Sequence, residues 1–329
     1  ALGLVTVLAT YGALRALFAD DPVLAVGGAG FVAFLPMQLA VTSAANNDAL
    51  ANAAAATALW VAALRMTDRI ADRPAVALGG AIAGLAILTK LTAAPAVVLI
   101  AAAEALRARA GSAGRIAARA AAPAALAAAI AAPWAVRNLA VYGRADAFGL
   151  RAHDAVVTGQ PRTADWIAEH GMAAFMERAA TFTFQSFWGV FGWLGVFLDG
   201  RIYAALALAS AVAATGAAVW VVRATRDAAR GPERRAAALL GLAVALSLAG
   251  FAWYNASFVQ HQGRYLFAAL PAWAGLWMVG LREWTRAVGR LLPGESARAA
   301  PVAAVLGFAA GLAALAWLAL VRYVVPGLG

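Results

Sequence analysis

Polar side chains follow an apolar stretch at residues 46–48, and they are the first place where this chain could carry out chemistry. Asn46, Asn47 and Asp48 come directly after FLPMQLAVTSAA. Asp48 could act as a general base, orient a sugar hydroxyl or hold a divalent cation. Asn and Asp before a helical run also act as N-caps, so a structural role is an equal alternative.

Lys90 is the single lysine of the chain and lies within GLAILTKLTAAP. Its ammonium group could pair with the phosphate of a lipid-linked substrate. A lysine beside an apolar segment also serves as an anchor that extends its ammonium toward the membrane surface. Spacing alone slightly favours the anchor.

Arg137 and Asn138 belong to the stretch PWAVRNLAVYG at the end of another apolar segment. A guanidinium at this position needs an anion. That anion could be a lipid headgroup, a carboxylate of the chain itself or the phosphate of a substrate. The residue types leave all three open.

His261, Gln262, Arg264 and Tyr265 occur together in the sequence HQGRY, just before a further apolar segment. A glycine followed by an arginine at a helix N-terminus favours anion binding, because the helix dipole and the guanidinium act together. Anchoring of Arg264 and Tyr265 at the membrane interface is an equal alternative.

The composition indicates which environment must position these groups. The chain has 329 residues, 64% hydrophobic and 13% charged, and its mean hydropathy is +0.77. A soluble domain is closer to half apolar and a quarter charged. Apolar segments of roughly 17–25 residues recur, and each is long enough to cross a membrane as a helix. We therefore predict an all-α, polytopic transmembrane helical bundle.

Basic residues exceed acidic ones, with a net charge of +10, but they cluster between apolar segments, as membrane topology requires. This pattern argues against a nucleic-acid partner. The chain has no cysteine, so it has no thiolate site. It also lacks a Cys/His metal-binding pattern, a G-x-S-x-G sequence and a phosphate-binding loop.

About ten spans fit the apolar pattern. Their approximate boundaries are 1–18, 22–43, 49–66, 75–90, 91–107, 118–137, 200–222, 236–255, 264–282 and 300–321.

Four arginine-rich connections set the predicted orientation of these spans, because short loops rich in arginine remain in the cytoplasm. An even number of predicted spans separates each one from the next, so all four can lie inside. The connections occupy 65–73, 107–119, 223–235 and 282–298. The polar stretches near Asp48, Lys90 and Arg264 then face outward. The same count places the first span's start outside, so we expect at least one further N-terminal span and an outer loop before it.

A long outer segment, 138–199, separates the sixth and seventh spans. Within it, 163–180 has the pattern of an amphipathic helix at the membrane interface, with Thr163 as a capping signal. The aromatic and glycine-rich stretch after it predicts a re-entrant or interfacial segment anchored by Trp188 and Trp193.

Five motifs in order, LPMQLAVTSAANNDAL, GLAILTKLTAAP, PWAVRNLAVYG, FWGVFGWLGVFLDG and QGRYLFAALPAWA, resemble bacterial membrane glycosyltransferases of the GT-C superfamily. These are relatives of the protein O-mannosyltransferases and the lipid A aminoarabinose transferases. The resemblance covers roughly residues 30 to 275. It implies an inverting transfer of a sugar from a polyprenyl phosphate to a lipid, glycan or protein, at the outer face of the bacterial inner membrane.

The resemblance also implies residue roles. Asp48 matches an acidic residue of the second outer loop, whereas Lys90 and Arg264 match candidate phosphate contacts and Arg137 and Asn138 match a pair without an assigned role. The residues expected to bind substrate are Asn46, Asn47, Lys90, Arg137, Asn138, His261, Gln262, Arg264 and Tyr265. The main catalytic acid of the superfamily lies in a first outer loop, which we expect to precede residue 1. Asp48 is therefore the best base candidate within this chain, and the pattern leaves a requirement for a divalent cation open.

Two other classes of function compete with this interpretation. A transporter or flippase of a lipid-linked glycan would show charged residues within spans, internal symmetry and broken helices. The predicted spans are nearly free of charge and show no clear repeat. A structural membrane subunit would not readily explain why Lys90, Arg137 and Arg264 all face outward.

Overall fold

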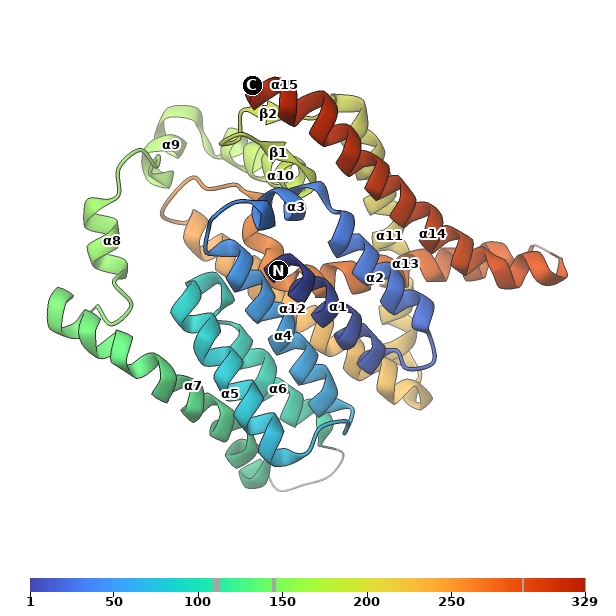
Figure 1. Ribbon diagram of the computed structural model, residues 1–329, viewed down its shortest axis with the longest axis horizontal. Helices are drawn as coiled ribbons and strands as arrows, with labels where there is room; N and C mark the ends of the chain where they lie inside the picture. The colour runs from blue at the N-terminus through green and yellow to red at the C-terminus, as the bar shows by residue number, and fades with distance from the viewer. Residues whose placement is uncertain (109–112, 144–145, 292, 329) are drawn as a thin grey trace.

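The computed structural model describes residues 1–329 except 109–112, 144–145, 292 and 329, and helices dominate it (Figure 1). In chain order the α-helices are α1 (Leu2–Leu17), α2 (Pro22–Phe34), α3 (Pro36–Ser43), α4 (Asp48–Met66), α5 (Asp72–Thr89), α6 (Ala96–Arg107), α7 (Ala113–Tyr142), α8 (Leu150–Val156), α9 (Thr163–His170), α10 (Met172–Trp188), α11 (Gly200–Arg226), α12 (Gly231–Asn255), α13 (Leu270–Gly289), α14 (Gly294–Ala319) and α15 (Val325–Leu328). The shorter elements are η1 (Leu91–Ala93), η2 (Ala228–Arg230), η3 (Gly263–Ala269), the π-helical turn η4 (Leu320–Val324) and the antiparallel hairpin of β1 (Val190–Phe191) and β2 (Val196–Phe197).

Six helices within the described ranges are long and apolar enough to cross a membrane, which supports a multi-pass membrane protein. The six are Asp48–Met66, Asp72–Thr89, Ala113–Tyr142, Gly200–Arg226, Ala228–Asn255 and Ala299–Leu328.

The other four predicted spans also contain helices, but these are short, bent or less apolar. Helix α1 has 16 residues and α6 has 12. Helices α2 and α3 make a seventh span only if the two are taken together. The predicted span at 264–282 begins as η3 and continues as α13. The count of ten spans therefore stays a prediction.

The predicted second span is broken by a bend of 57° between α2 and α3. Pro36 begins α3, and Leu35 before it has an extended backbone, φ −64° and ψ 116°. Proline disfavours the helical conformation in the residue before it and supplies no backbone N–H of its own. The bend turns α3 and the chain after it toward the start of α4.

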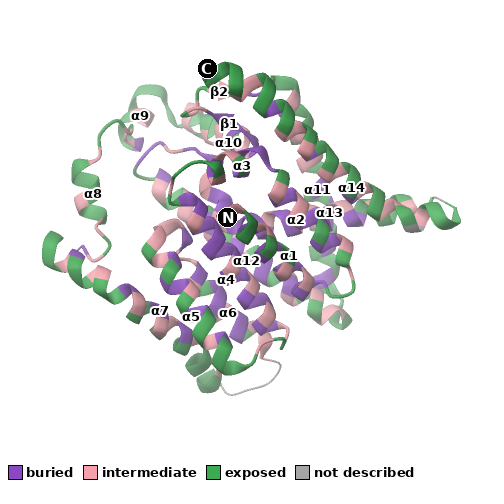
Figure 2. Cartoon of the chain, in the orientation of Figure 1, coloured by how far each residue is buried: buried purple, intermediate pink, exposed green. Residues whose placement is uncertain are grey.

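Buried residues concentrate where α1, α2, α4 and α13 meet, whereas α7, α8 and α14 are mostly exposed (Figure 2). Helix α4 is the most enclosed of the candidate spans, with 78% of its apolar window buried. Alanine-rich faces allow such close approach between helices. Gly216 of α11 and Gly280 of α13 meet with their backbones almost in contact, since a Cβ on Gly280 would lie 1.9 Å from a backbone oxygen of α11.

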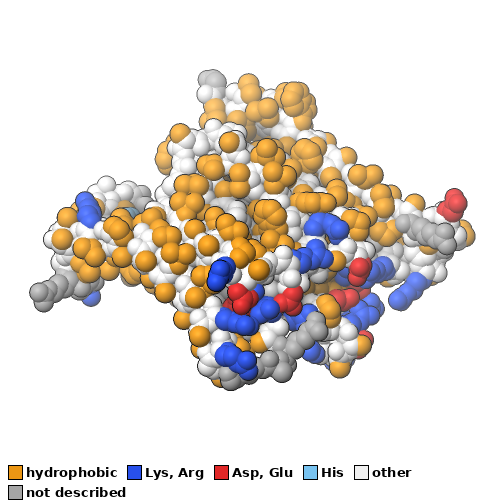
Figure 3. Space-filling model, turned by 60° about the horizontal axis from the view of Figure 1, so that its bottom comes forward, with side chains coloured by type: hydrophobic (Ala, Val, Ile, Leu, Met, Phe, Trp, Pro, Cys, Tyr) orange, Lys and Arg blue, Asp and Glu red, His pale blue; other side chains and the backbone are white. Residues whose placement is uncertain are grey.

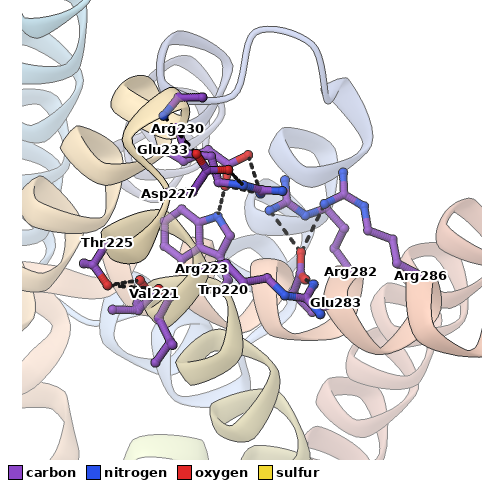
Figure 4. A network of polar contacts seen from close by, with 12 residues as sticks. Trp220, Val221, Arg223, Thr225, Asp227, Arg230, Glu233, Arg282, Glu283 and Arg286 are labelled. Atoms are coloured by element: carbon purple, nitrogen blue, oxygen red, sulfur yellow. Dashed lines mark hydrogen bonds and ion pairs between the residues drawn. The ribbon is translucent and has the colours of Figure 1, made fainter.

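Charged side chains gather at one end of the bundle, which comes forward in Figure 3. We call this the arginine-rich end. Figure 4 shows part of it, where Glu283 lies among Arg223, Arg282 and Arg286. The pairs Arg65–Glu104 and Arg107–Asp68 connect α6 with the last turn of α4 and with the turn after it. The four connections predicted to be cytoplasmic contribute these residues, although 109–112 of one connection lie outside the described residues.

The long segment 138–199, which was predicted to lie outside, differs from its predicted secondary structure. The single amphipathic helix at 163–180 is interrupted at Gly171, whose φ of 86° suits glycine, and the chain continues as α10 as far as Trp188. Thr163 does not cap α9. Its hydroxyl donates a hydrogen bond to the backbone oxygen of Asn255, 2.8 Å away, and so joins the start of α9 to the end of α12.

The two tryptophans predicted as interfacial anchors have opposite environments. Trp188 is 2% exposed and packs in the core against Phe31 and Trp277, so the prediction was wrong for it. Trp193 is fully exposed at the turn between β1 and β2. A two-stranded hairpin at 190–197 occupies part of the stretch that was predicted as a re-entrant or interfacial segment.

Candidate functional site

Asp48 does not cap α4, which separates the two alternatives that its sequence position left open. The side-chain oxygen of Asn46 accepts the hydrogen bond from the backbone N–H of Ala49, at 3.1 Å. Asn46 thus satisfies a free N–H of the first turn. The carboxylate of Asp48 instead forms ion pairs with Lys90 and with Arg264, the latter at 3.6 Å between Oδ2 and Nη1.

Lys90 lies where α5 ends and η1 begins, with an extended backbone that directs the chain back into the bundle. Its ammonium donates a hydrogen bond to Oδ1 of Asp48 and lies 4.9 Å from the ring centroid of Tyr265. The Lys90 side chain is 22% exposed. An anchoring lysine would extend away from the protein, so the geometry favours the inward alternative.

Arg264 and Tyr265 reach the same place from η3. The guanidinium carbon of Arg264 lies 5.6 Å from the Tyr265 ring centroid, and its Nε donates a hydrogen bond to Oε1 of Gln262 at 2.7 Å. Contacts of α4, η1 and η3 with one another bring these side chains together. We call Asp48, Lys90, Arg264 and Tyr265 the Asp48 cluster. It contains two cations and one carboxylate, and this excess of positive charge suits an anionic ligand.

A cavity of about 930 Å³ lies beside the Asp48 cluster and shares Arg264 and Tyr265 with it. One part of its wall is polar, and the rest is apolar, formed by α3, the β1–β2 hairpin and the end of α14 with η4. The polar residues of the wall include Asn46, Gln160, Gln260, Gln262, Arg264 and Tyr265. Arg264 is the one charged residue in the described lining. Such a cavity can hold a polar group with an apolar chain attached to it.

His261 lies behind this wall. It is 2% exposed, and its ring meets the ring of Phe175 edge-on, with 4.7 Å between centroids. Neither ring nitrogen has a hydrogen-bond partner among the described residues. Burial lowers the pKa of His261 to about 4, and the charge of Arg178 contributes. His261 was predicted to contact substrate, but its neighbours Gln260 and Gln262 line the cavity in its place.

The Arg137–Asn138 pair lies apart from the Asp48 cluster, near the end of α7. Arg137 donates hydrogen bonds to Oδ1 of Asn138 at 3.1 Å and to the hydroxyl of Tyr142 at 3.0 Å. Asn138 in turn donates to the backbone oxygen of Ala147. Neither residue lines the cavity, and neither does the exposed Asn47. The structure therefore leaves Arg137 and Asn138 away from the other predicted contacts, and Asn47 exposed beside Asp48.

Sequence reasoning missed Gln160 and Gln260. Backbone hydrogen bonds from Val259 to Pro161 and from Thr163 to Ser257 align the two segments, and this pairing places Gln160 near Gln260. The two glutamines are separated by 100 positions, and neither belongs to a recognisable motif. Their polar character beside Pro161 and His261 was the only available signal.

The described residues contain no group of three or more side chains of the kinds that hold a metal ion. The Asp48 carboxylate contacts cationic side chains instead. We compared the chain with protein-family models, with curated proteins and with solved structures, and none of them matches. The geometry of the Asp48 cluster and of its cavity therefore carries the functional argument.

Proposed function

We propose that this chain is a membrane glycosyltransferase that transfers a sugar from a polyprenyl phosphate to a lipid, glycan or protein acceptor at the outer membrane face. The observation that carries the proposal is the Asp48 cluster. Three residues from distant segments, Asp48, Lys90 and Arg264, form one group at the first turn of α4, whose last turn carries Arg65 of the arginine-rich end. A carboxylate with two cations offers a base and a site for a leaving phosphate.

The cavity supports a lipid-linked donor. Its polar wall ends at Arg264, which could hold a phosphate, and the apolar wall of α3 and the end of α14 could hold the first part of a hydrocarbon chain. Polar groups next to the phosphate position could hold a sugar. A purely soluble substrate would leave the apolar wall without a partner.

The ion pairs suggest how the reaction begins. In the unliganded protein the Asp48 carboxylate is the partner of Lys90 and Arg264. The donor phosphate takes over these two cations and releases the carboxylate. Asp48 then accepts the proton of the acceptor hydroxyl as its oxygen bonds to the anomeric carbon. The bond between that carbon and the phosphate oxygen breaks, and the polyprenyl phosphate leaves with the electron pair.

An Asp48→Asn variant tests the proposal. The asparagine keeps the size of the side chain but cannot accept the proton, so sugar transfer from polyprenyl-phosphate donors should fall by about 100-fold or more. Asp165→Asn, an exposed position on α9, is the matched control and should transfer normally. Transfer would be measured in vesicles with radiolabelled donor. Normal transfer by Asp48→Asn would remove Asp48 from the mechanism.

A flippase of a lipid-linked glycan is the second candidate, and the break between α2 and α3 favours it. Broken helices occur at the binding sites of many transporters. Here α3 lines the cavity, so the break also fits a fixed substrate wall. Vesicles that carry donor in one leaflet distinguish the two functions: a flippase equalises the leaflets without an acceptor, whereas a transferase forms product only when acceptor is present.

A further inference from the structure

The hydrogen bonds around Arg264 determine how the nearby glutamine amides are oriented. An arginine guanidinium can only donate hydrogen bonds. Since Nε of Arg264 lies 2.7 Å from Gln262, that side chain must present its oxygen to Arg264. Its amide nitrogen then donates to Oε1 of Gln260, 2.6 Å away. The carbonyl oxygen of Gln260 is thereby engaged within the protein, and its NH₂ group is turned away from Gln262.

Gln160 has a similar arrangement. The hydroxyl of Tyr254 donates to its Oε1 at 3.1 Å. Among the described residues, neither the NH₂ group of Gln160 nor that of Gln260 has a hydrogen-bond acceptor, and both side chains line the cavity. With Arg264, the polar wall therefore presents N–H donors. A ligand that satisfies these donors must supply acceptor atoms, such as hydroxyl or carboxylate oxygens.

The charge of the cavity adds a second constraint. Its described lining includes Arg264 and no carboxylate. The neighbouring carboxylate, Asp48, is engaged with Lys90 and Arg264 and lies outside the lining. Beside Gln160 and Gln260, an ammonium group would lose water and meet N–H donors, and the described lining there offers it no carboxylate.

We propose that the cavity selects a donor whose sugar is uncharged or anionic and rejects a sugar that carries a free amino group. Gln160 and Gln260 determine this specificity. The inference rests on the proposed function, because it concerns the sugar of a polyprenyl-phosphate donor. Neither the charge pattern nor the motif order of the sequence predicts this selectivity. An amino sugar is rejected because its ammonium group finds no partner of opposite charge in the lining.

Donor binding tests the inference directly. The probes are polyprenyl phosphate alone and its glucose, N-acetylglucosamine and glucosamine derivatives, with the full chain in nanodiscs at pH 7. The glucose and N-acetylglucosamine donors should bind at least as tightly as polyprenyl phosphate, and the glucosamine donor at least tenfold more weakly than either. Equal binding of all three sugar donors would overturn this inference alone. Failure of polyprenyl phosphate itself to bind would overturn the proposed function, and this inference with it.

An added negative charge gives a sharper test. Gln260→Glu supplies a carboxylate in the cavity, so it should tighten binding of the glucosamine donor and weaken that of the glucose donor. Gln160→Glu is the second variant, in case the first does not fold. Gln185→Glu, on α10 and outside the lining, is the matched control and should retain the original order. If a folded cavity variant kept the original order, the two glutamines would have no role in selection.

Discussion

At the scale of single residues, the position of Asp48 depends on the cap that its neighbour provides. Because Asn46 satisfies the backbone at the start of α4, the Asp48 carboxylate is available to Lys90 and Arg264. The sequence left capping and chemistry as equal alternatives for Asp48. Only the side-chain contacts separate them.

Removal of one cation should weaken binding of the donor phosphate. Arg264→Ala deletes a charged partner, and hydrogen bonds to charged groups contribute about 1.5–3 kcal/mol, so the affinity for polyprenyl phosphate should fall by about 10- to 100-fold. Arg137→Ala is the control, because Arg137 lies outside the cavity. Affinity can be measured by native mass spectrometry of the reconstituted protein. Similar losses in both variants would contradict a specific role for Arg264.

His261 should make the protein sensitive to acid. Folding lowers its pKa from 6.5 to about 4. Between these values the unfolded chain binds more protons, so stability is complete above pH 6.5 and decreases as the pH falls toward 4. The loss should be about 2–3 kcal/mol over this window.

The measurement is the thermal midpoint of the purified protein between pH 7.5 and 4.5. His261→Gln should flatten the pH dependence, whereas the exposed His153→Gln should leave it as in the unmodified protein. A pH dependence that His261→Gln does not change would show that other groups dominate it.

At the scale of elements, the close approach of α11 and α13 depends on two glycines. A Cβ at position 280 would lie 1.9 Å from the backbone oxygen of Ala213, so the helices must separate to admit it. Gly280→Ala should therefore destabilise the protein by about 1–3 kcal/mol, the usual cost of overpacking.

Gly241→Ala is the matched control for this prediction. Gly241 lies within α12, and a Cβ there meets nothing within 4 Å. Alanine favours a helix more than glycine does, so this variant should be neutral or more stable by up to about 1 kcal/mol. The two variants can be compared by thermal unfolding in detergent. Equal stability would indicate that the α11–α13 contact adjusts freely.

At the scale of the whole molecule, the proposed site requires that the Asp48 cluster and the arginine-rich end lie on opposite sides of the membrane. The chain has no cysteine, so single cysteines can report sidedness without background. Ala45 precedes Asp48 in the chain, and Ser257 precedes Arg264. Thr225 lies in the last turn of α11, next to the arginines of that turn.

A membrane-impermeant maleimide should label Ala45→Cys and Ser257→Cys in intact cells. Thr225→Cys should react only after the membrane is opened, because arginine-rich connections remain inside. All three positions are exposed in the structure, so failure to react reports sidedness rather than burial. If Ala45→Cys and Ser257→Cys reacted from different sides, the Asp48 cluster could not form.

The sequence by itself determined which segments become helices and where the charged connections lie. Hydrophobicity and helix length are local properties, so 49–66, for example, agrees closely with α4. The continuous segments predicted at 22–43 and 163–180 run through Pro36 and Gly171, where the structure breaks the helix. The prediction of one helix at 163–180 was wrong for this reason.

Tertiary structure decided which polar residues meet. Lys90 and Arg264 lie 42 and 216 positions from Asp48, and nothing local distinguishes them from Arg137, which the fold leaves elsewhere. The same holds for Gln160, which reaches Gln260 through backbone pairing, and for His261, which turns toward Phe175. Contacts between distant segments depend on how helices pack and where loops return, and these depend on the whole chain at once.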